Sequence, residues 1–128
     1  MQKSFLFSLL LIVTILSCGE DTVKTSVDIL AGKWNIHEAY RDGRETQTLK
    51  KGYFEFSTDQ KLKTNILQDT LFYPYKLSGN KIKLEDAHKI SYTVMKLTSD
   101  SLILETKIRK FDFRILLLKK GDEELPVQ

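Results

Sequence analysis

Short runs in which apolar and polar residues alternate occupy most of the chain after residue 32. A period of two is typical of β-strands that bury one face. The first run, residues 33–41, places on one face Trp34, Ile36, Glu38 and Tyr40. Seven further runs have as their expected inward residues Phe54 and Phe56; Leu62, Thr64 and Ile66; Leu71, Tyr73, Tyr75 and Leu77; Ile82 and Leu84; Ile90, Tyr92 and Val94; Leu102, Leu104 and Thr106; Phe111 and Phe113. The pattern therefore predicts eight strands.

The segments between these runs consist of turn-forming residues. Residues 57–60, 78–80 and 98–101 are short and rich in Ser, Thr, Asp, Asn and Gly, whereas residues 42–52 form the longest connection. Eight strands with short connections predict an antiparallel meander, and closing it removes the unpaired edges. The predicted fold class is therefore all-β: an eight-stranded antiparallel up-and-down barrel. A short helical turn at 26–31, capped by Ser26 or Asp28, is expected to precede it.

Two irregularities are expected within the strands. Pro74 cannot donate a backbone hydrogen bond and marks weak pairing or a bulge in the fourth strand. The alternation shifts phase at Lys96-Leu97, which indicates a β-bulge in the sixth.

The first 17 residues predict a secretion signal, with Lys3 ahead of an apolar run from Phe5 to Leu16 and the small residue Ser17. The run is too short for a membrane-spanning helix, which needs about 20 residues. Residues 18–28 are then expected to form a tether, residues 29–120 the barrel and residues 121–128 a flexible tail. Cleavage after residue 17 leaves 111 residues and lowers the formal net charge from +3 to +2.

The segment Ile15-Leu16-Ser17-Cys18 resembles the lipobox of bacterial lipoproteins. The resemblance implies that Cys18, the one cysteine, is the site of lipidation and carries several acyl chains, palmitate among them, which anchor the protein to a membrane. Glycine rather than aspartate follows Cys18, which is similar to outer-membrane lipoproteins, and Gly19-Glu20-Asp21 resembles the surface-export signals of Bacteroidetes lipoproteins. The expected location is therefore the cell envelope, on the periplasmic or surface face of the outer membrane.

Gly32-Lys33-Trp34, placed at the start of the first of eight strands, resembles the Gly-x-Trp fingerprint of lipocalins. The resemblance implies a lipocalin-like barrel in which Gly32 and Trp34 are structural residues of the closed base. It also implies a basic residue packed over the tryptophan. Lys119 and Lys120 lie at the matching end of the last strand, with Arg114 as a third candidate.

An eight-stranded interior can be filled by side chains or can hold one small ligand. Aromatic rings with a few polar tips are the usual lining of a small-molecule pocket. The candidate ligand-binding residues are Ile36, Glu38, Tyr40, Phe54, Phe56, Tyr73, Tyr75, Tyr92, Arg109 and Phe111. An inward carboxylate is costly unless it is paired or hydrated, so Glu38 is expected to pair with Arg109 or to contact a ligand or water. The alternative is that the rings simply fill the core.

Other classes of function find no support in the sequence. The weak net charge argues against a nucleic-acid partner. His37 and His88 are isolated and belong to no metal-site or nucleophile motif, so we expect no metal, no cofactor and no enzymatic activity. Two functions remain: binding of a small hydrophobic or amphipathic molecule inside the barrel, or action as an accessory protein of an envelope complex through the outer surface. Leu116 and Leu118 could form an outer patch for such a partner, or could be covered by the 26–31 turn.

Overall fold

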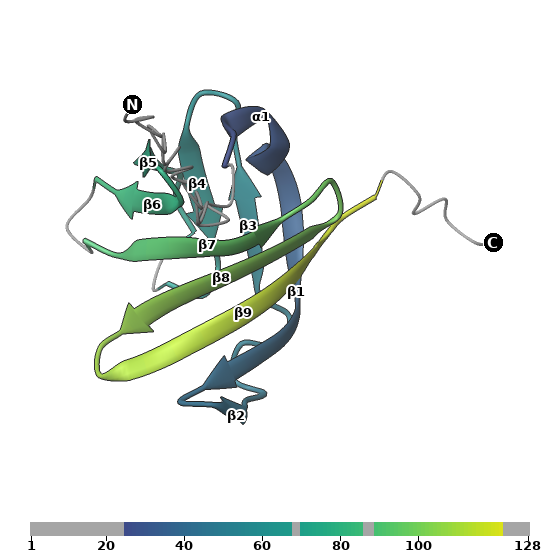
Figure 1. Ribbon diagram of the computed structural model, residues 1–128, viewed down its shortest axis with the longest axis vertical. Helices are drawn as coiled ribbons and strands as arrows, with labels where there is room; N and C mark the ends of the chain where they lie inside the picture. The colour runs from purple at the N-terminus through teal and green to yellow at the C-terminus, as the bar shows by residue number, and fades with distance from the viewer. Residues whose placement is uncertain (1–24, 68–69, 86–88, 122–128) are drawn as a thin grey trace, which may run out of the picture.

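The computed structural model describes residues 25–67, 70–85 and 89–121. The predicted signal, Cys18 and most of the tether, His88, and the tail after Gly121 lie outside these residues. The elements, shown in Figure 1, are α1 (Val27–Leu30), β1 (Gly32–Arg41), β2 (Arg44–Glu45), β3 (Tyr53–Phe56), β4 (Lys61–Thr64), β5 (Tyr73–Ser78), β6 (Lys81–Leu84), β7 (Ser91–Leu97), β8 (Ser101–Ile108) and β9 (Phe111–Lys119).

All nine strands belong to one antiparallel sheet with the order β2-β1-β3-β4-β5-β6-β7-β8-β9, and β1 also pairs with β9. The pairing of β1 with β9 runs from Trp34 opposite Lys119 to Arg41 opposite Phe113, so it closes the sheet on itself. The unpredicted strand β2 only extends a hairpin at the end of β1. The predicted lipocalin-like, eight-stranded up-and-down barrel is therefore confirmed.

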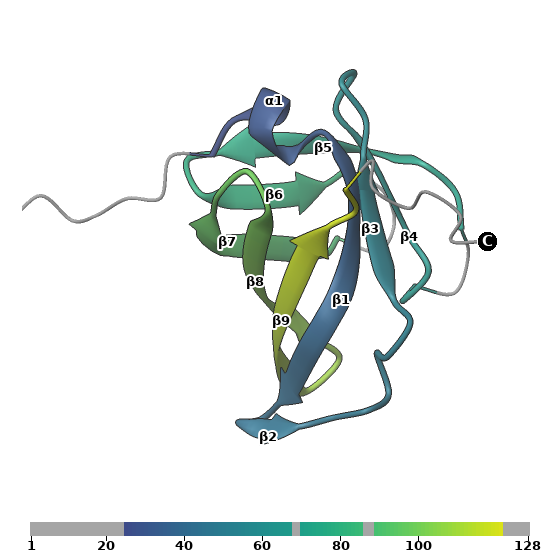
Figure 2. The same cartoon turned by 90° about the vertical axis from the view of Figure 1, so that its right-hand side faces the viewer.

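The end of the barrel nearest α1, called here the base, is closed by the helix (Figure 2). Ser26 caps α1, its hydroxyl accepting from the Asp28 backbone N–H at 3.3 Å, so Ser26 rather than Asp28 is the cap. Leu30 at the end of α1 is fully buried. Because the capped helix begins at Val27, the predicted boundary between tether and barrel at residue 28 falls inside α1.

Trp34 is the centre of this base. Its side chain is 0% exposed, and its indole Nε1 donates to the Leu30 carbonyl at 2.8 Å. Lys119 Nζ lies 5.2 Å from the centroid of the Trp34 ring and also donates to the Ile29 carbonyl at 3.5 Å. Of the three basic candidates, Lys119 therefore makes the cation–π contact.

Gly32 is needed for this arrangement. Its φ of +128° lies in a region that side chains disfavour, and a Cβ there would be 2.8 Å from Lys119 Cε. The Gly-x-Trp spacing therefore places a residue without a side chain where Lys119 crosses the base to reach Trp34.

Among the eight strands of the barrel, pairing is thinnest between β4 and β5, where only Lys61 with Pro74 and Leu62 with Tyr73 are in register. Pro74 has no N–H to give to this ladder, as expected. Leu71 lies before β5 and is exposed, so it is not the inward residue that the alternation predicted. The predicted bulge in β7 is confirmed, since the register with β8 shifts between Val94 and Lys96.

The hydrophobic core lies inside the barrel and takes residues from α1 and from every strand except β2. Leu30 and Leu117 are its first and last buried members in the sequence. The closed sheet, together with the base that α1 and Trp34 fill, thus encloses one continuous hydrophobic core. Residues 19–128 contain all of these core residues.

Candidate functional site

Four of the predicted lining residues are inward and buried, as expected: Phe54, Phe56, Tyr75 and Tyr92. Their rings contact one another. The Phe54 and Tyr92 centroids are 5.3 Å apart at 88°, and those of Phe56 and Tyr75 are 5.7 Å apart at 90°. These edge-to-face contacts are the arrangement that aromatic pairs prefer in a packed core. Two further predicted residues, Ile36 and Tyr73, are partly buried against this cluster.

Glu38 and Tyr40 do not line the interior, so their predicted placement was wrong. A register shift between Ile36 and Glu38 in the pairing with β9 inserts an extra residue into β1. A shift by one residue moves every later side chain to the opposite face. Ala39, opposite Ile115, is consequently the buried residue at 3% exposure, whereas Tyr40 pairs with the outward Arg114.

The expected pairing of Glu38 with Arg109 is also wrong. Glu38 instead accepts a hydrogen bond from the Tyr40 hydroxyl at 3.0 Å, and His37 Nε2 lies 4.0 Å from its carboxylate. This hydrogen bond is the main cause that raises the pKa of Tyr40, because ionising the phenol would place two negative charges side by side. Both side chains belong to the outer surface of the barrel.

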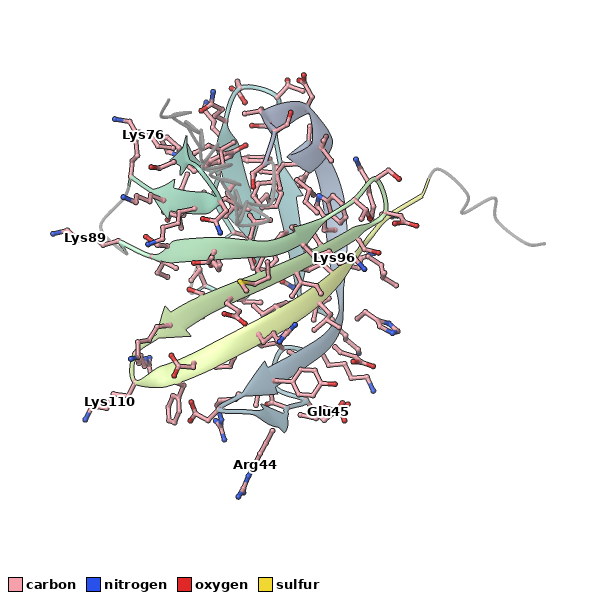
Figure 3. The ribbon with its side chains drawn as sticks, in the orientation of Figure 1. Arg44, Glu45, Lys76, Lys89, Lys96 and Lys110 are labelled. Atoms are coloured by element: carbon pink, nitrogen blue, oxygen red, sulfur yellow. The ribbon has the colours of Figure 1, made fainter. Side chains whose placement is uncertain are left out.

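Arg109 and Phe111 lie at the β8–β9 hairpin, at the end of the barrel away from α1. Arg109 occupies the turn with a φ of 60°, and both residues are exposed. The Phe111 ring is covered on one side by the Arg41 guanidinium, 4.9 Å from its centroid. Figure 3 shows Lys110 of this turn and Arg44 of β2 projecting away from the barrel at the same end. Arg109 and Phe111, which were predicted to bind a ligand, therefore lie on the surface of the β8–β9 hairpin and not in the barrel interior.

Tyr75 places a polar atom in the barrel interior. Its side chain is buried, and its hydroxyl has no hydrogen-bond partner among the residues that the structure describes. Burial raises the pKa of this hydroxyl above the ordinary value, and the charge of Asp59 acts in the same direction. The Tyr75 hydroxyl is therefore a protonated donor at neutral pH that the core leaves unsatisfied.

A broad hollow lies on the outside of the barrel. It has a volume of about 860 Å³, and its lining includes Tyr40, Thr93, Glu105, Arg114 and Leu116. Two smaller hollows lie beside Lys33 and Lys119 at the base, and between His37 and the 45–50 loop. None of the five interior rings of Trp34, Phe54, Phe56, Tyr75 and Tyr92 lines any of these three hollows.

We call the outward side chains of β1, β7, β8 and β9 the outer face; Figure 1 views the molecule from this side. Leu118 and Met95 on this face are 46% and 42% exposed. Leu116 and Ile103 lie opposite each other on β9 and β8 and are partly buried. The exposure of Leu118 means that α1 does not cover it, so Leu118 and the partly buried Leu116 both lie on the outer face.

The sequence alone indicated only some of the residues on the outer face. Leu116 and Leu118 stood out because residues 115–118 are apolar in both phases of the alternation. Ile103 carries the same signal, an apolar residue between two inward leucines, and was missed. Glu105 and Arg114 gave no signal, because their pairing across β8 and β9 depends on the register of two strands.

No protein-family model matches the chain, and no curated protein matches it. In residues 25–67, 70–85 and 89–121, no helix combines the length and the hydropathy that a membrane span requires. The same residues contain no group of three or more histidine, cysteine, aspartate or glutamate side chains that could hold a metal ion.

Proposed function

We propose that this chain is a lipid-anchored protein of the bacterial cell envelope that acts as an accessory or interaction protein through the outer face of β1, β7, β8 and β9. The barrel interior is then a structural core rather than a ligand cup. The observation that carries the proposal is the packing of the interior rings against one another, with exposures of 2% or less.

The outer face has the composition of an interaction surface. The partly buried Ile103 and Leu116 at its centre, together with the exposed Met95 and Leu118, are bordered by charged residues, which is the usual arrangement of an apolar patch with a polar rim. The hollow of about 860 Å³ opens on the same face, and Tyr40 is part of its lining. A filled barrel with such a surface supports binding of another macromolecule better than it supports carriage of a small molecule.

The anchor and the base of the barrel belong to the same end of the chain. Residues 18–25 can span at most about 25 Å when fully extended. If Cys18 is lipidated, as its resemblance to a lipobox implies, the base with α1 faces the membrane at close range. The outer face then stands beside the membrane, where other envelope proteins can reach it.

Native mass spectrometry of the full chain, produced in a Gram-negative bacterium and extracted from its membranes, tests this proposal. We expect a mass that begins at an acylated Cys18 and includes no stoichiometric small molecule. A photo-reactive residue at position 103 on the outer face should cross-link to a protein, whereas one at position 83 on β6 should not. A small molecule that co-purifies at one copy per chain, together with equal cross-linking at both positions, would refute the proposal.

The second candidate is binding of a small amphipathic molecule inside the barrel, and the unsatisfied Tyr75 hydroxyl favours it. Tyr75→Phe separates the two candidates. If the core is filled, removing a buried hydroxyl without a partner should leave the free energy of unfolding unchanged or raise it by up to about 1 kcal/mol. Chemical denaturation measures this, with Tyr53→Phe on the partly exposed face of β3 as the matched control. A loss of more than about 1 kcal/mol, or of a co-purified molecule, would favour the ligand cup.

A further inference from the structure

The outward residues of the outer face form rows that cross the four strands, and one row is polarised. Strand pairing aligns Lys96 of β7 with Ile103 of β8, Ile103 with Leu116 of β9, and Leu116 with Glu38 of β1. A cation thus stands at one end of the row, an anion at the other, and two aliphatic side chains between them. Lys96 and Glu38 are three strand spacings apart, about 14 Å, and do not contact each other.

The next two rows, which lie nearer the β8–β9 hairpin, carry opposite charges on the two central strands of the face, β8 and β9. Glu105 of β8 is in register with Arg114 of β9, their charged atoms 3.9 Å apart, and Lys107 of β8 is in register with Asp112 of β9 at the same distance. These pairs are exposed and long for hydrogen-bonded ion pairs, so each charge can also interact with a group placed above it.

We propose that the outer face binds a second copy of this chain, with the twofold axis parallel to the strands and between β8 and β9. This inference rests on the proposed function and names the partner. Such an axis places each residue of a row above the residue at the same distance on the other side of the axis. Lys96 then faces the partner's Glu38, and Ile103 faces the partner's Leu116.

The other rows are complementary under the same operation. Glu105 faces the partner's Arg114, and Lys107 faces the partner's Asp112. The Tyr40 ring sits above the partner's Thr93, which lines the hollow of about 860 Å³. Every charge in these three rows thus meets an opposite charge while the aliphatic residues meet each other, so the face complements itself better than it would complement a surface of one charge.

The anchor geometry agrees with this axis. Rotation about an axis parallel to the strands leaves both bases, and therefore both copies of α1, at the same end of the dimer. Two tethers that leave from the same end can reach one membrane. A twofold axis across the strands would send the bases in opposite directions, and it would also place β8 above the partner's β8 and β9 above the partner's β9, so that Glu105 would not face Arg114.

Mixing two charge-reversal variants gives the decisive experiment. In soluble protein of residues 19–128, Lys96→Glu and Glu38→Lys each place like charges opposite each other twice in a homodimer, so each should weaken the dimer at least about tenfold. An equimolar mixture should form a heterodimer, because both cross-interface pairs become opposite again. Native mass spectrometry with one variant isotope-labelled counts the three dimers, and sedimentation gives their dissociation constants.

Two further variants control for other causes. Lys83→Glu makes the same charge change on the exposed side of β6 and should leave the dimer unchanged, whereas Leu116→Glu should abolish it. Thermal melts confirm that each variant is folded, and the charge reversals keep the test valid if Leu116→Glu is not. A wild-type domain that stays monomeric at high concentration, or a mixture that gains no heterodimer, would overturn the inference. Cross-linking of position 103 to a different protein in that case would leave the proposed function standing.

Discussion

Replacing Trp34 by alanine is expected to lower the free energy of unfolding by about 3–5 kcal/mol, the usual cost of truncating a fully buried large aromatic residue. Trp34 fills the base of the barrel with no exposed surface. Its removal also leaves the Leu30 carbonyl without its donor and takes the ring away from Lys119. Because Leu30 and Lys119 belong to α1 and β9, the substitution should loosen both the helix and the closing strand. Chemical denaturation of residues 19–128 measures the change.

Two milder variants separate the contributions at this base. Trp34→Phe keeps a ring but loses the indole N–H, so we expect about 1–2 kcal/mol of destabilisation. Lys119→Met keeps the aliphatic stem and loses only the ammonium, which should cost about 0.5–1 kcal/mol. A Trp34→Ala variant that loses less than about 1 kcal/mol would show that Trp34 does not close the barrel.

Ala39→Glu is the second substitution with a large expected effect. The bulge in β1 turns Ala39 inward, where it lies opposite Ile115 in the core at 3% exposure. A glutamate there must enter a packed interior and bury a carboxylate without a partner, which should cost about 3 kcal/mol or more. We expect a domain that is largely unfolded or that melts far below the wild type. Circular dichroism during thermal unfolding measures the difference.

The matched variant is Glu38→Ala, one residue earlier in the same strand. Glu38 is on the outer face, so removing its carboxylate and the hydrogen bond from Tyr40 should change the free energy of unfolding by about 0.5 kcal/mol or less. The measurement is made at low protein concentration so that association does not contribute. Strict alternation along β1 predicts the opposite order of effects, and that order would show that the bulge is absent.

The interior and the exterior of this barrel differ in the side chains that are available for binding. Inside, aromatic rings contact each other edge to face, and the buried Tyr75 hydroxyl has no hydrogen-bond partner among the described residues. Outside, opposite charges and aliphatic side chains occur in an ordered sequence across four strands. Specific recognition requires such an ordered set of groups, which is why the outer face carries both the proposed function and the proposed dimer.

The local pattern of the sequence was sufficient to predict the barrel. Alternation placed Phe54, Phe56, Tyr92, Leu102 and Leu104 inward, because a strand with one buried face must repeat with a period of two. Turn residues located the connections at 57–60, 78–80 and 98–101. Gly32 and Trp34 marked the base, and the phase shift near Lys96 marked a bulge. Each of these features is local, so the neighbouring residues contain the information that specifies it.

Which side chains of β1 lie inside the barrel and which lie outside depends on long-range strand pairing. The bulge in β1 arises from pairing with β9, some 80 residues away, and nothing in the alternation of residues 33–41 reveals it. Because of this bulge, Glu38 and Tyr40 lie on the outer face and not in the interior, where the alternation predicts them. The selection of Lys119 over Lys120 and Arg114 at the base, and the alignment of Lys96, Ile103, Leu116 and Glu38 in one row, likewise depend on strand register. Register is set by closure of the whole sheet, and therefore no single segment of the sequence contains it.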